Sequence, residues 1–404
     1  MVSRQLTLGA RLIRLQSDRQ YCNCWGCDHR MKAVICLNTA WNLFNFRAGL
    51  IRALVAAGYE VVAVAPYDDY APRLEALGCR FVALPMDNRG THPGRDLLLG
   101  WRFWQLFRLE RPDVYLGYTA KPNIYGTVAA HLLGVKVINN IAGLGSVFIE
   151  GGVLARLLRF MYRVALKRSH CVFFQNHEDL QQFVVANMVR PDQAVLIPGS
   201  GVDLDYFSDA AVSNPGTSKA GFRFLLVGRM LKDKGVVEFV EAACQLRKSH
   251  PTAEFCLLGF LDAQNPTALT RDQVQAWVAQ GSVNYLGVSD DVRSQLAAAD
   301  CIVLPSYREG LPRTLLEAAA MGKPIVATDV PGCRSVVVDS ENGFLCRPKD
   351  AQDLAANMAK MLALPKATRH QMGRAGRLKM EHEFGEQVVI GHYLSAIVDA
   401  TRPP

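Results

Sequence analysis

Short apolar runs alternate with longer amphipathic segments over most of the chain, a pattern typical of βαβ units and parallel sheets. In the first half, this pattern predicts strands at 32–38, 60–65, 80–84, 113–117, 136–140 and 170–175. Helices are predicted between these strands at 45–57, 97–110, 122–133 and 153–167.

The alternation breaks at residues 198–220, which are rich in Ser, Gly, Asn and Pro and are typical of a linker. A second series follows, with strands predicted at 222–227, 253–258, 282–286, 300–304 and 324–328. Its helices are predicted at 235–249, 270–280, 290–298, 312–321 and beyond 350. The predicted fold class is therefore α/β, with two lobes of similar size. Because ligands of such sheets bind beyond the carboxyl ends of the strands, we expect the site in a cleft between the lobes.

Length and composition agree with two globular lobes. A chain of 404 residues exceeds the size at which one hydrophobic core keeps growing. The net charge of +8 suits anionic partners such as nucleotide phosphates or an acidic membrane surface. No run of Lys and Arg interleaved with aromatic residues predicts nucleic-acid binding. No uncharged apolar stretch reaches the roughly 18 to 20 residues that span a bilayer, which predicts a soluble or peripherally attached protein.

The cysteines indicate a reducing compartment, and we expect the cytoplasm. The chain has 11 of them, an odd number that does not suit a disulfide framework. Several lie in predicted strands, where thiols act as small buried hydrophobic groups. These strand cysteines are Cys36, Cys171, Cys256 and Cys301.

Residues 1–30 differ from the rest because they are Arg-rich and lack the apolar segment of a secretory signal. Their Cys22, Cys24, Cys27 and His29 are spaced as in a zinc knuckle. A structural zinc site normally uses two ligand pairs separated by a folded segment, however, and no second pair follows. We therefore expect an N-terminal extension, disordered or upstream of a start at Met31.

Two loops of the second lobe carry the densest candidate chemistry. The first follows the strand that ends at Gly228, where Arg229 and Lys234 project before a helix begins near Gly235. Two cations beside a positive helix end suit a diphosphate. Two solvated surface charges would give the same pattern, so this segment alone leaves both interpretations open.

The second loop lies in the stretch PSYREGLPRTLLE at residues 305–317. Glu309 precedes the helix and Glu317 lies on it eight positions later, so two carboxylates can accept hydrogen bonds from separate sets of sugar hydroxyls. The amides of Gly310 and Leu311 would face an anion at the helix N-terminus. A helix-start charge for Glu309 and an exposed helix residue for Glu317 are the plain alternatives.

Taken together, these motifs resemble the retaining glycosyltransferases of family 4, which have the GT-B fold of two doubly wound Rossmann-like domains facing across a cleft. The resemblance extends from about Met31 to about residue 395. It implies an N-terminal acceptor-binding domain at 31–200 and a nucleotide-sugar-binding domain at 201–383. It also implies a C-terminal helix within 384–404 that packs back on the first domain.

The resemblance also implies residue roles on the donor side. Arg229 and Lys234, after Gly228, match the positions that hold the diphosphate and neutralise the leaving group. Glu309 matches the residue at the transferred sugar, and Glu317 matches the ribose ligand. The remaining matches are the phosphate-facing amides of Gly310 and Leu311 and the nucleobase neighbours Gly287 and Val288.

No metal cofactor is expected, because the acidic pairs Asp68-Asp69 and Asp290-Asp291 are typical of turns or helix starts rather than of a metal-binding motif. The cation pair would stabilise the leaving diphosphate without a metal. The donor is expected to be UDP-linked.

The acceptor side is less well defined, because the glycine-rich loop with His found in many family members is missing after the first strand. Two segments that follow later strands, residues 121–123 and 141–146, resemble bacterial transferases that extend sugars on polyprenyl diphosphate. Lys121 would contact an acceptor phosphate, or cap a turn. The full set of candidate acceptor residues is Asn45, Arg47, Lys121, Asn123 and Gly145.

Residues 153–168 combine leucines and aromatic residues with five cations at three- and four-residue steps. This pattern is typical of an interfacial helix attracted to anionic lipid, here the inner membrane. An amphipathic helix packed on its own sheet is the alternative.

The motifs thus predict a hexosyltransferase that moves a hexose or N-acetylhexosamine from UDP to a polyprenyl-diphosphate-linked glycan in surface polysaccharide or glycoconjugate synthesis. A nucleotide-sugar epimerase of the same fold and a non-catalytic scaffold remain as alternatives. An NAD-dependent oxidoreductase is disfavoured, because no G-x-G-x-x-G follows a strand.

Overall fold

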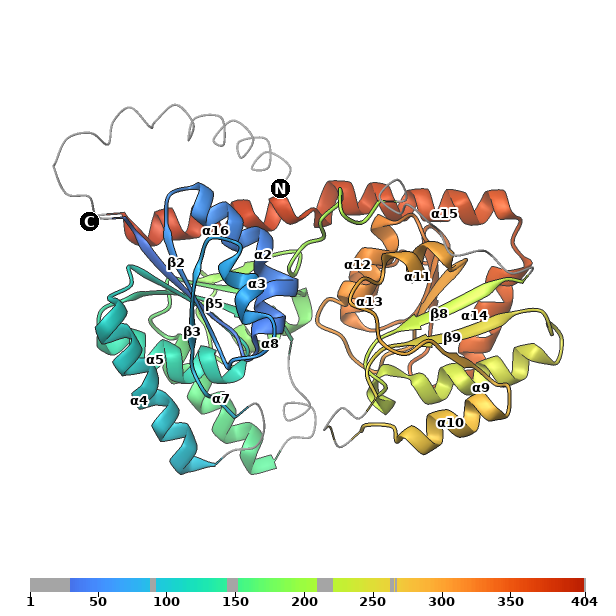
Figure 1. Cartoon of the computed structure of the whole chain (residues 1–404), viewed down its shortest axis with the longest axis horizontal. Helices are drawn as coiled ribbons and strands as arrows, with labels where there is room; N and C mark the ends of the chain where they lie inside the picture. Colours follow the sequence, from blue (N-terminus) through green and yellow to red (C-terminus); the bar gives the residue numbers. More distant parts are fainter. Residues whose placement is uncertain are drawn as a thin grey trace.

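The computed structural model describes residues 30–87, 92–143, 152–208, 221–261, 265 and 267–402. Two parallel sheets lie side by side, each covered on both faces by helices (Figure 1). The strand orders are β3-β2-β1-β4-β5-β6-β7 in the first lobe and β10-β9-β8-β11-β12-β13 in the second. The predicted pair of parallel α/β lobes is confirmed.

The first lobe is built on buried apolar strands whose register pairs Ile35 with Ala63 and Val34 with Tyr115. Helices α2, α3 and α16 pack on one face of this sheet, and α4, α5, α7 and α8 pack on the other. Its elements are β1 (Lys32–Cys36), α2 (Ala40–Ala56), β2 (Glu60–Ala65), α3 (Ala71–Glu75), β3 (Arg80–Ala83), α4 (Pro93–Glu110), β4 (Val114–Tyr118), η3 (Pro122–Gly126), α5 (Thr127–Leu132), β5 (Lys136–Ile141), α7 (Gly152–Leu166), β6 (Cys171–Phe174), α8 (His177–Val185) and β7 (Ala194–Leu196).

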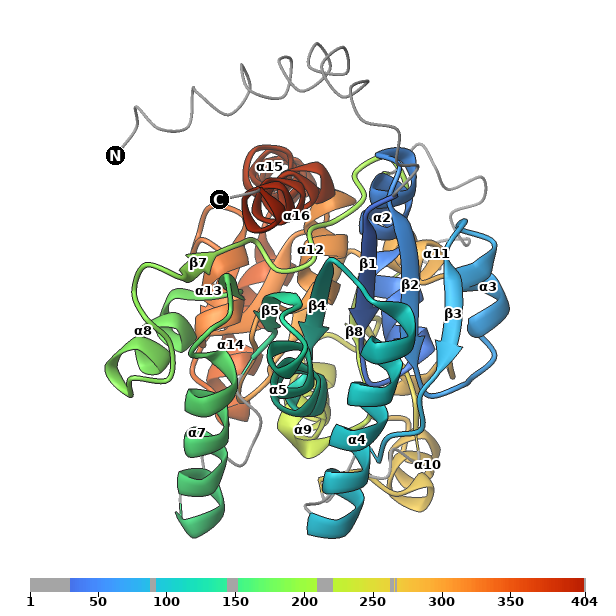
Figure 2. The same cartoon turned by 90° about the vertical axis from the view of Figure 1, so that its left-hand side faces the viewer.

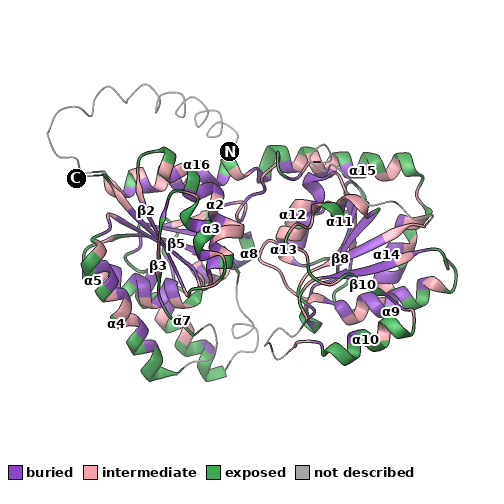
Figure 3. Cartoon of the chain, in the orientation of Figure 1, coloured by how far each residue is buried: buried purple, intermediate pink, exposed green. Residues whose placement is uncertain are grey.

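The second lobe repeats this layered arrangement, with α9, α10 and α14 on one face and α11, α12 and α13 on the other. Figure 3 shows the buried positions concentrated on the strands and on the inner faces of the helices. Its elements are β8 (Arg223–Val227), η5 (Lys232–Lys234), α9 (Val236–Arg247), β9 (Glu254–Leu258), α10 (Arg271–Ala279), β10 (Asn284–Tyr285), α11 (Arg293–Ala298), β11 (Cys301–Leu304), α12 (Arg313–Ala320), β12 (Ile325–Thr328), α13 (Pro331–Val336), β13 (Gly343–Cys346), α14 (Ala351–Ala363) and α15 (Lys366–Lys379).

The C-terminal segment returns to the first lobe. After α15, the π-helical η6 (Met380–Phe384) leads into α16 (Glu386–Thr401), which lies over the first lobe in Figure 1. Tyr393 of α16 packs its ring 4.7 Å from that of Phe173, and its hydroxyl accepts a 2.9 Å hydrogen bond from Asn140. Ile397 of α16 is fully buried in the same cluster as Ile35 of β1.

Sequence and structure differ mainly at short or capped elements. The predicted helix at 45–57 begins earlier, at Ala40, because the Thr39 hydroxyl caps it by accepting from the Asn42 amide at 3.0 Å. The predicted helix at 122–133 opens with a π-helical turn. The pattern missed several elements, most of them short: α3, α8, α13, β7 and β13.

Candidate functional site

The loop after β8 is held against the end of β11. Gly235 has φ +71°, and a Cβ there would lie only 2.0 Å from the Pro305 carbonyl oxygen. Only glycine suits this backbone and this close approach. The constraint places Lys234, at the end of the 3-10 turn η5, beside the loop that follows β11.

Lys234 and Glu309 form an ion pair, with Nζ 2.5 Å from Oε1. The Lys234 side chain is 24% exposed and that of Glu309 is 10% exposed. Arg229 is solvent-exposed, and among the described residues no hydrogen bond or ion pair engages its side chain. The site therefore offers one paired cation and one uncommitted cation at the carboxyl edge of the second sheet.

Tyr307 ties the two loops together. Its amide donates to the Asp233 carbonyl at 2.9 Å, and its hydroxyl donates to Glu238 Oε1 at 2.6 Å. Burial and the neighbouring Glu238 carboxylate raise the pKa of Tyr307, so this hydroxyl stays a donor at neutral pH. The loop that carries Glu309 is thus fixed from the side of α9.

Glu317 lies on α12 and is paired within the helix. Arg313 Nε donates to Glu317 Oε1 at 2.7 Å. Burial raises the pKa of Glu317, while the Arg313 charge and hydrogen bond oppose the shift. A carboxylate at this position can accept hydrogen bonds, at the cost of its desolvation.

Aromatic and charged side chains border Glu317. The Arg293 guanidinium carbon lies 3.7 Å from the Tyr206 ring centroid, and Arg293 Nη2 donates to Asp291 Oδ2 at 2.6 Å. The guanidinium of Arg293 lowers the pKa of Asp291 by hydrogen bonding, so this carboxylate remains ionised. The predicted nucleobase neighbours lie after β10, where Gly287 has φ +78° and accepts from the Gly259 amide at 2.8 Å. Val288 is exposed.

The donor-side loops also contact the first lobe. Arg313 Nη1 donates to the Asn45 carbonyl at 2.5 Å, and its guanidinium lies 5.1 Å from the Phe46 ring centroid. Asn176, after β6, donates to the Gly310 carbonyl at 3.1 Å.

A further cross-lobe pair joins Arg308 to the buried carboxylate of Asp179 at 2.8 Å. A Cβ on Gly143, after β5, would lie 3.4 Å from Gly310 Cα. The carboxyl edges of the two sheets therefore meet around the 305–317 segment. Leu311 lies against Gly199 of the inter-lobe linker, because a Cβ on Gly199 would lie only 2.6 Å from a methyl carbon of Leu311.

The candidate acceptor residues do not form one surface. Asn45 lies at the inter-lobe edge and donates its amide to the Trp41 carbonyl at 2.9 Å. Arg47 is buried and lies 4.4 Å from the Tyr118 ring centroid, so it faces the core. The Lys121 ammonium forms a 2.7 Å ion pair with the buried carboxylate of Asp96, so the charge of Lys121 is already neutralised within the fold.

Asn123 corrects the sequence expectation. Its side chain is 1% exposed, donates to the Asn140 carbonyl and accepts from Asn139, both at 2.9 Å. A buried amide with satisfied partners is not presented to an acceptor. Gly145 lies outside the described residues.

Sequence reasoning missed Arg313 and Thr119. Arg313 stands four residues before Glu317, a spacing at which opposite charges pair on a helix, so its pairing was predictable. Thr119 follows β4 with φ +60°, a strained conformation for a β-branched residue, at the carboxyl edge of the first sheet. The alternation of apolar and polar positions in the sequence does not predict this strained backbone conformation.

Helix α7 leaves an apolar stripe open to solvent. It buries Ala155, Tyr162, Ala165 and Leu166 against the lobe. The exposed apolar side chains recur at helical spacing, and the cations Arg156 and Arg163 lie beside them. The exposed set is Val153, Leu154, Leu157, Phe160 and Val164.

Within the part of the chain that the structure describes, no helix is both long and apolar enough to cross a bilayer. No group of three or more His, Cys, Asp or Glu side chains is placed to hold a metal ion within the same ranges. The zinc-knuckle spacing at Cys22–His29 lies outside them.

Two parallel-sheet lobes that meet at the carboxyl edges of their strands, with a Lys–Glu pair and a helical carboxylate at the junction, define the GT-B class of glycosyltransferases. Family comparisons identify both lobes. The sequence model of glycosyl transferases group 1 matches residues 211–379, and that of the glycosyl transferase 4-like domain matches residues 46–199. The chain belongs to this family of GT-B glycosyltransferases.

Individual relatives extend over most of the chain. It is 28% identical to the N,N'-diacetylbacillosaminyl-diphospho-undecaprenol alpha-1,3-N-acetylgalactosaminyltransferase of Campylobacter jejuni, over 87% of this chain and 94% of that protein. It is 31% identical to glycogen synthase of Mycobacterium tuberculosis, over 84% of this chain and 86% of that protein. The crystal structure of Anabaena HepE in complex with UDP-glucose superposes on this chain with a TM-score of 0.74 at 17% identity. The match covers 92% of this chain and 100% of the HepE chain.

Proposed function

We propose that this glycosyltransferase moves a hexose or N-acetylhexosamine from a UDP-sugar to a polyprenyl-diphosphate-linked glycan, with retention of anomeric configuration. The observation that carries the proposal is the junction of the lobes, where Arg229, Lys234, Glu309 and Glu317 gather at adjacent strand ends. Two cations and two carboxylates in this order suit the diphosphate, the sugar and the ribose of one nucleotide sugar.

Each donor-side residue has a role that follows from its position. Arg229 and Lys234 neutralise the departing diphosphate, which is a charge-stabilising contribution that grows as the bond breaks. Glu309, held by Lys234 at 2.5 Å, orients the hydroxyls of the transferred sugar. Glu317 accepts from the ribose hydroxyls and exchanges its Arg313 partner for them.

Retention is explained by attack from the side of the leaving group. The acceptor hydroxyl oxygen forms the new bond to the anomeric carbon as the bond from that carbon to the diphosphate oxygen breaks. The hydroxyl proton passes to the departing phosphate oxygen, so the protein needs no separate base. This path requires no metal ion, and the two cations offset the charge left on UDP.

The acceptor class is supported by the names of relatives. The Campylobacter protein is named for a diphospho-undecaprenol acceptor, and an Escherichia coli relative, 26% identical over 61% of this chain, is named for alpha-D-GlcNAc-diphosphoundecaprenol. A lipid-linked acceptor places the reaction at a membrane surface, and we propose a cytoplasmic enzyme attached peripherally to the inner membrane.

The membrane-facing surface would combine two helices. Leu97, Leu98 and Trp101 near the start of α4 are exposed, as is the apolar stripe of α7. The starts of both helices project from the same side of the first lobe, at the bottom of Figures 1 and 2. Apolar side chains with Arg156 beside them suit insertion between anionic headgroups, whereas Arg163 donates to the Ala186 carbonyl at 2.7 Å and so holds α7 against the end of α8.

A ligand screen tests the donor proposal first. Thermal unfolding is followed with UDP, GDP, ADP and NAD added separately, with Glu317→Ala as the control. A ligand at about 100-fold excess over Kd stabilises the folded form by ~2.7 kcal/mol. A shift with UDP alone that disappears in the control supports the donor site, whereas a shift only with NAD, or none, refutes it.

A turnover assay tests the reaction. UDP-N-acetylhexosamines and UDP-hexoses are incubated with an undecaprenyl-diphosphate-linked N-acetylhexosamine in detergent, and the extended lipid is analysed by mass spectrometry and by NMR of the new linkage. A retained anomer supports the mechanism. An inverted anomer refutes it, and an epimerised UDP-sugar formed without acceptor would establish the epimerase alternative.

A further inference from the structure

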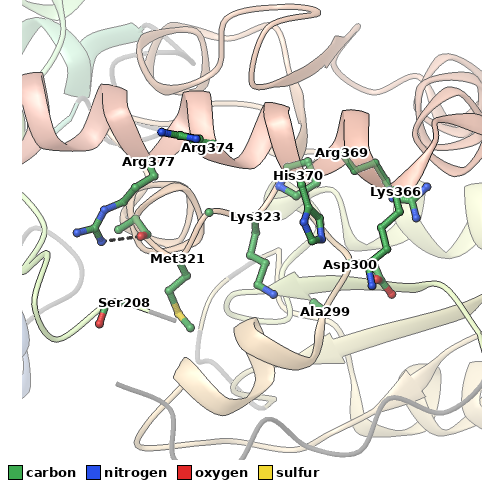
Figure 4. A pocket seen from close by; sticks show the side chains of 13 residues that line it. Ser208, Ala299, Asp300, Met321, Lys323, Lys366, Arg369, His370, Arg374 and Arg377 are labelled. Carbon is green, nitrogen blue, oxygen red and sulfur yellow. Dashed lines mark hydrogen bonds between the residues drawn. The ribbon is translucent and has the colours of Figure 1, made fainter. Parts of the chain in front are cut away.

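A cavity lies on the second lobe, away from the inter-lobe junction. It has a volume of about 360 Å³ and lies beneath α15, where the chain enters β11 and β12 (Figure 4). These are the amino ends of the strands, whereas the donor-side loops follow the carboxyl ends. The cavity is therefore a separate site on the same sheet.

The lining is strongly cationic. Five Lys and Arg side chains face a single carboxylate, that of Asp300, whose oxygen already accepts from the Arg223 amide at 2.8 Å. Helix α15 supplies most of the charge and contains no acidic residue. The cationic lining residues are Lys323, Lys366, Arg369, Arg374 and Arg377, with His370 between them.

Part of this charge has a structural use. Arg377 donates to the Ala320 carbonyl at 2.7 Å, and Lys323 donates to the Ala297 carbonyl at 2.7 Å. Arg369 stacks 4.9 Å from the Phe222 ring centroid. These three side chains hold α15 and the strand entries in place.

The other polar side chains that α15 contributes to the lining have no such use. Lys366, His370 and Arg374 are exposed, recur every four residues on one face of the helix, and make no hydrogen bond or ion pair with the residues described. Figure 4 shows His370 pointing from the helix into the cavity. Lys366 and Arg374 lie two turns apart on this face and no carboxylate of α15 offsets their charge, so a bound anion would pair with both.

We propose that this cavity binds a small phosphorylated anion, of the size of a sugar phosphate. Its volume lies at the lower end of the range for small-molecule sites, which suits one phosphate group with a compact substituent. Lys366 and Arg374 supply uncommitted charge from α15, and Lys323 adds a cation from the loop before β12.

The source of the phosphate is a soluble molecule rather than a lipid headgroup. In Figure 2, α15 lies at the top of the molecule, whereas α4 and α7 project at the bottom. A flat membrane that meets α4 and α7 cannot also reach the cavity. This step rests on the proposed membrane surface, but the binding of an anion does not.

Equilibrium dialysis of the full chain with radiolabelled glucose 6-phosphate tests the site, in the presence of excess UDP so that the junction is filled. The pocket variant is Lys366→Ala/Arg374→Ala, and the charge-matched control is Lys136→Ala/Lys248→Ala, two exposed lysines elsewhere. We expect one saturable site, weakened at least tenfold in the pocket variant and unchanged in the control.

Several outcomes would overturn the proposal. They are no saturable binding, equal weakening in both variants, and competition by short-chain phosphatidylglycerol but not by inorganic phosphate. Equal unfolding midpoints of the variants without ligand exclude misfolding as the cause, and Lys366→Gln/Arg374→Gln provides a second test if alanine destabilises the helix. Failure of UDP to bind the wild-type chain would count against the donor proposal alone.

Discussion

The Lys234–Glu309 pair allows the sharpest test of the donor site. Lys234→Met removes the charge and keeps most of the side-chain volume. If Lys234 stabilises the leaving diphosphate, losing one such electrostatic contact lowers kcat by about 10²–10³, equivalent to ~2.7–4 kcal/mol. The KM for the UDP-sugar should change less, because the charge of the leaving group develops as the bond breaks.

The same substitution has a structural cost, because it leaves Glu309 only 10% exposed and without its 2.5 Å partner. Removing one partner of a buried pair is more damaging than replacing both, and we expect a loss of about 2–3 kcal/mol in this partly solvated setting. Lys234→Met/Glu309→Gln should recover most of that stability. It should not recover turnover.

The assay measures UDP release and glycan extension under single-turnover conditions, alongside unfolding in urea. Lys232→Met is the matched control, since Lys232 is exposed on the same turn and differs in lacking the pairing with Glu309. Near-wild-type kcat in Lys234→Met, or equal losses in Lys232→Met, would refute the reasoning. Recovery of turnover in the double variant would show that Lys234 acts only by holding the fold.

Three further predictions concern other parts of the molecule. Burial raises the pKa of Glu317 above the usual Glu range, so this carboxylate takes up its proton at a higher pH than a solvated Glu does. Protonation removes the charge that would accept from the ribose hydroxyls. The affinity for the UDP-sugar should therefore fall as the pH drops toward this raised pKa. Calorimetric titration from pH 8 to 5 checks this, and Glu317→Gln should bind weakly with no such slope. Leu157→Ser/Phe160→Ser should weaken binding to phosphatidylglycerol vesicles about tenfold in a flotation assay, while Val185→Ser, an exposed apolar residue on α8, should not. Deletion of residues 1–30 should leave turnover unchanged, and a zinc-dependent loss would contradict the expected extension.

The architecture could be predicted because each buried strand is a short apolar run between helical periodicities. Strand β2 has the predicted bounds, and β8 and β11 differ from theirs by a residue. Helix α13 and strand β13 were missed because four to six residues bounded by Pro and Gly carry too little periodicity to distinguish them from a loop.

The donor-side cluster was predictable for a related reason, since loops after adjacent parallel strands must meet at one edge. The cross-lobe contacts were not, because the hydrogen bond from Arg313 to Asn45 joins residues 268 positions apart. Asn123 shows the converse failure. A polar residue after a strand was expected at the surface, and the structure uses it to satisfy buried amides.

The return of α16 to the first lobe affects how the chain folds as it is synthesised. Domains generally fold as units, N-terminal first, when each contains its own core. Here Tyr393 and Ile397 complete the core around β1 and β4, yet they leave the ribosome after the whole second lobe. The nascent first lobe must therefore wait with an open apolar groove. A premature stop before Glu386 would damage the lobe translated first, although the missing residues come last.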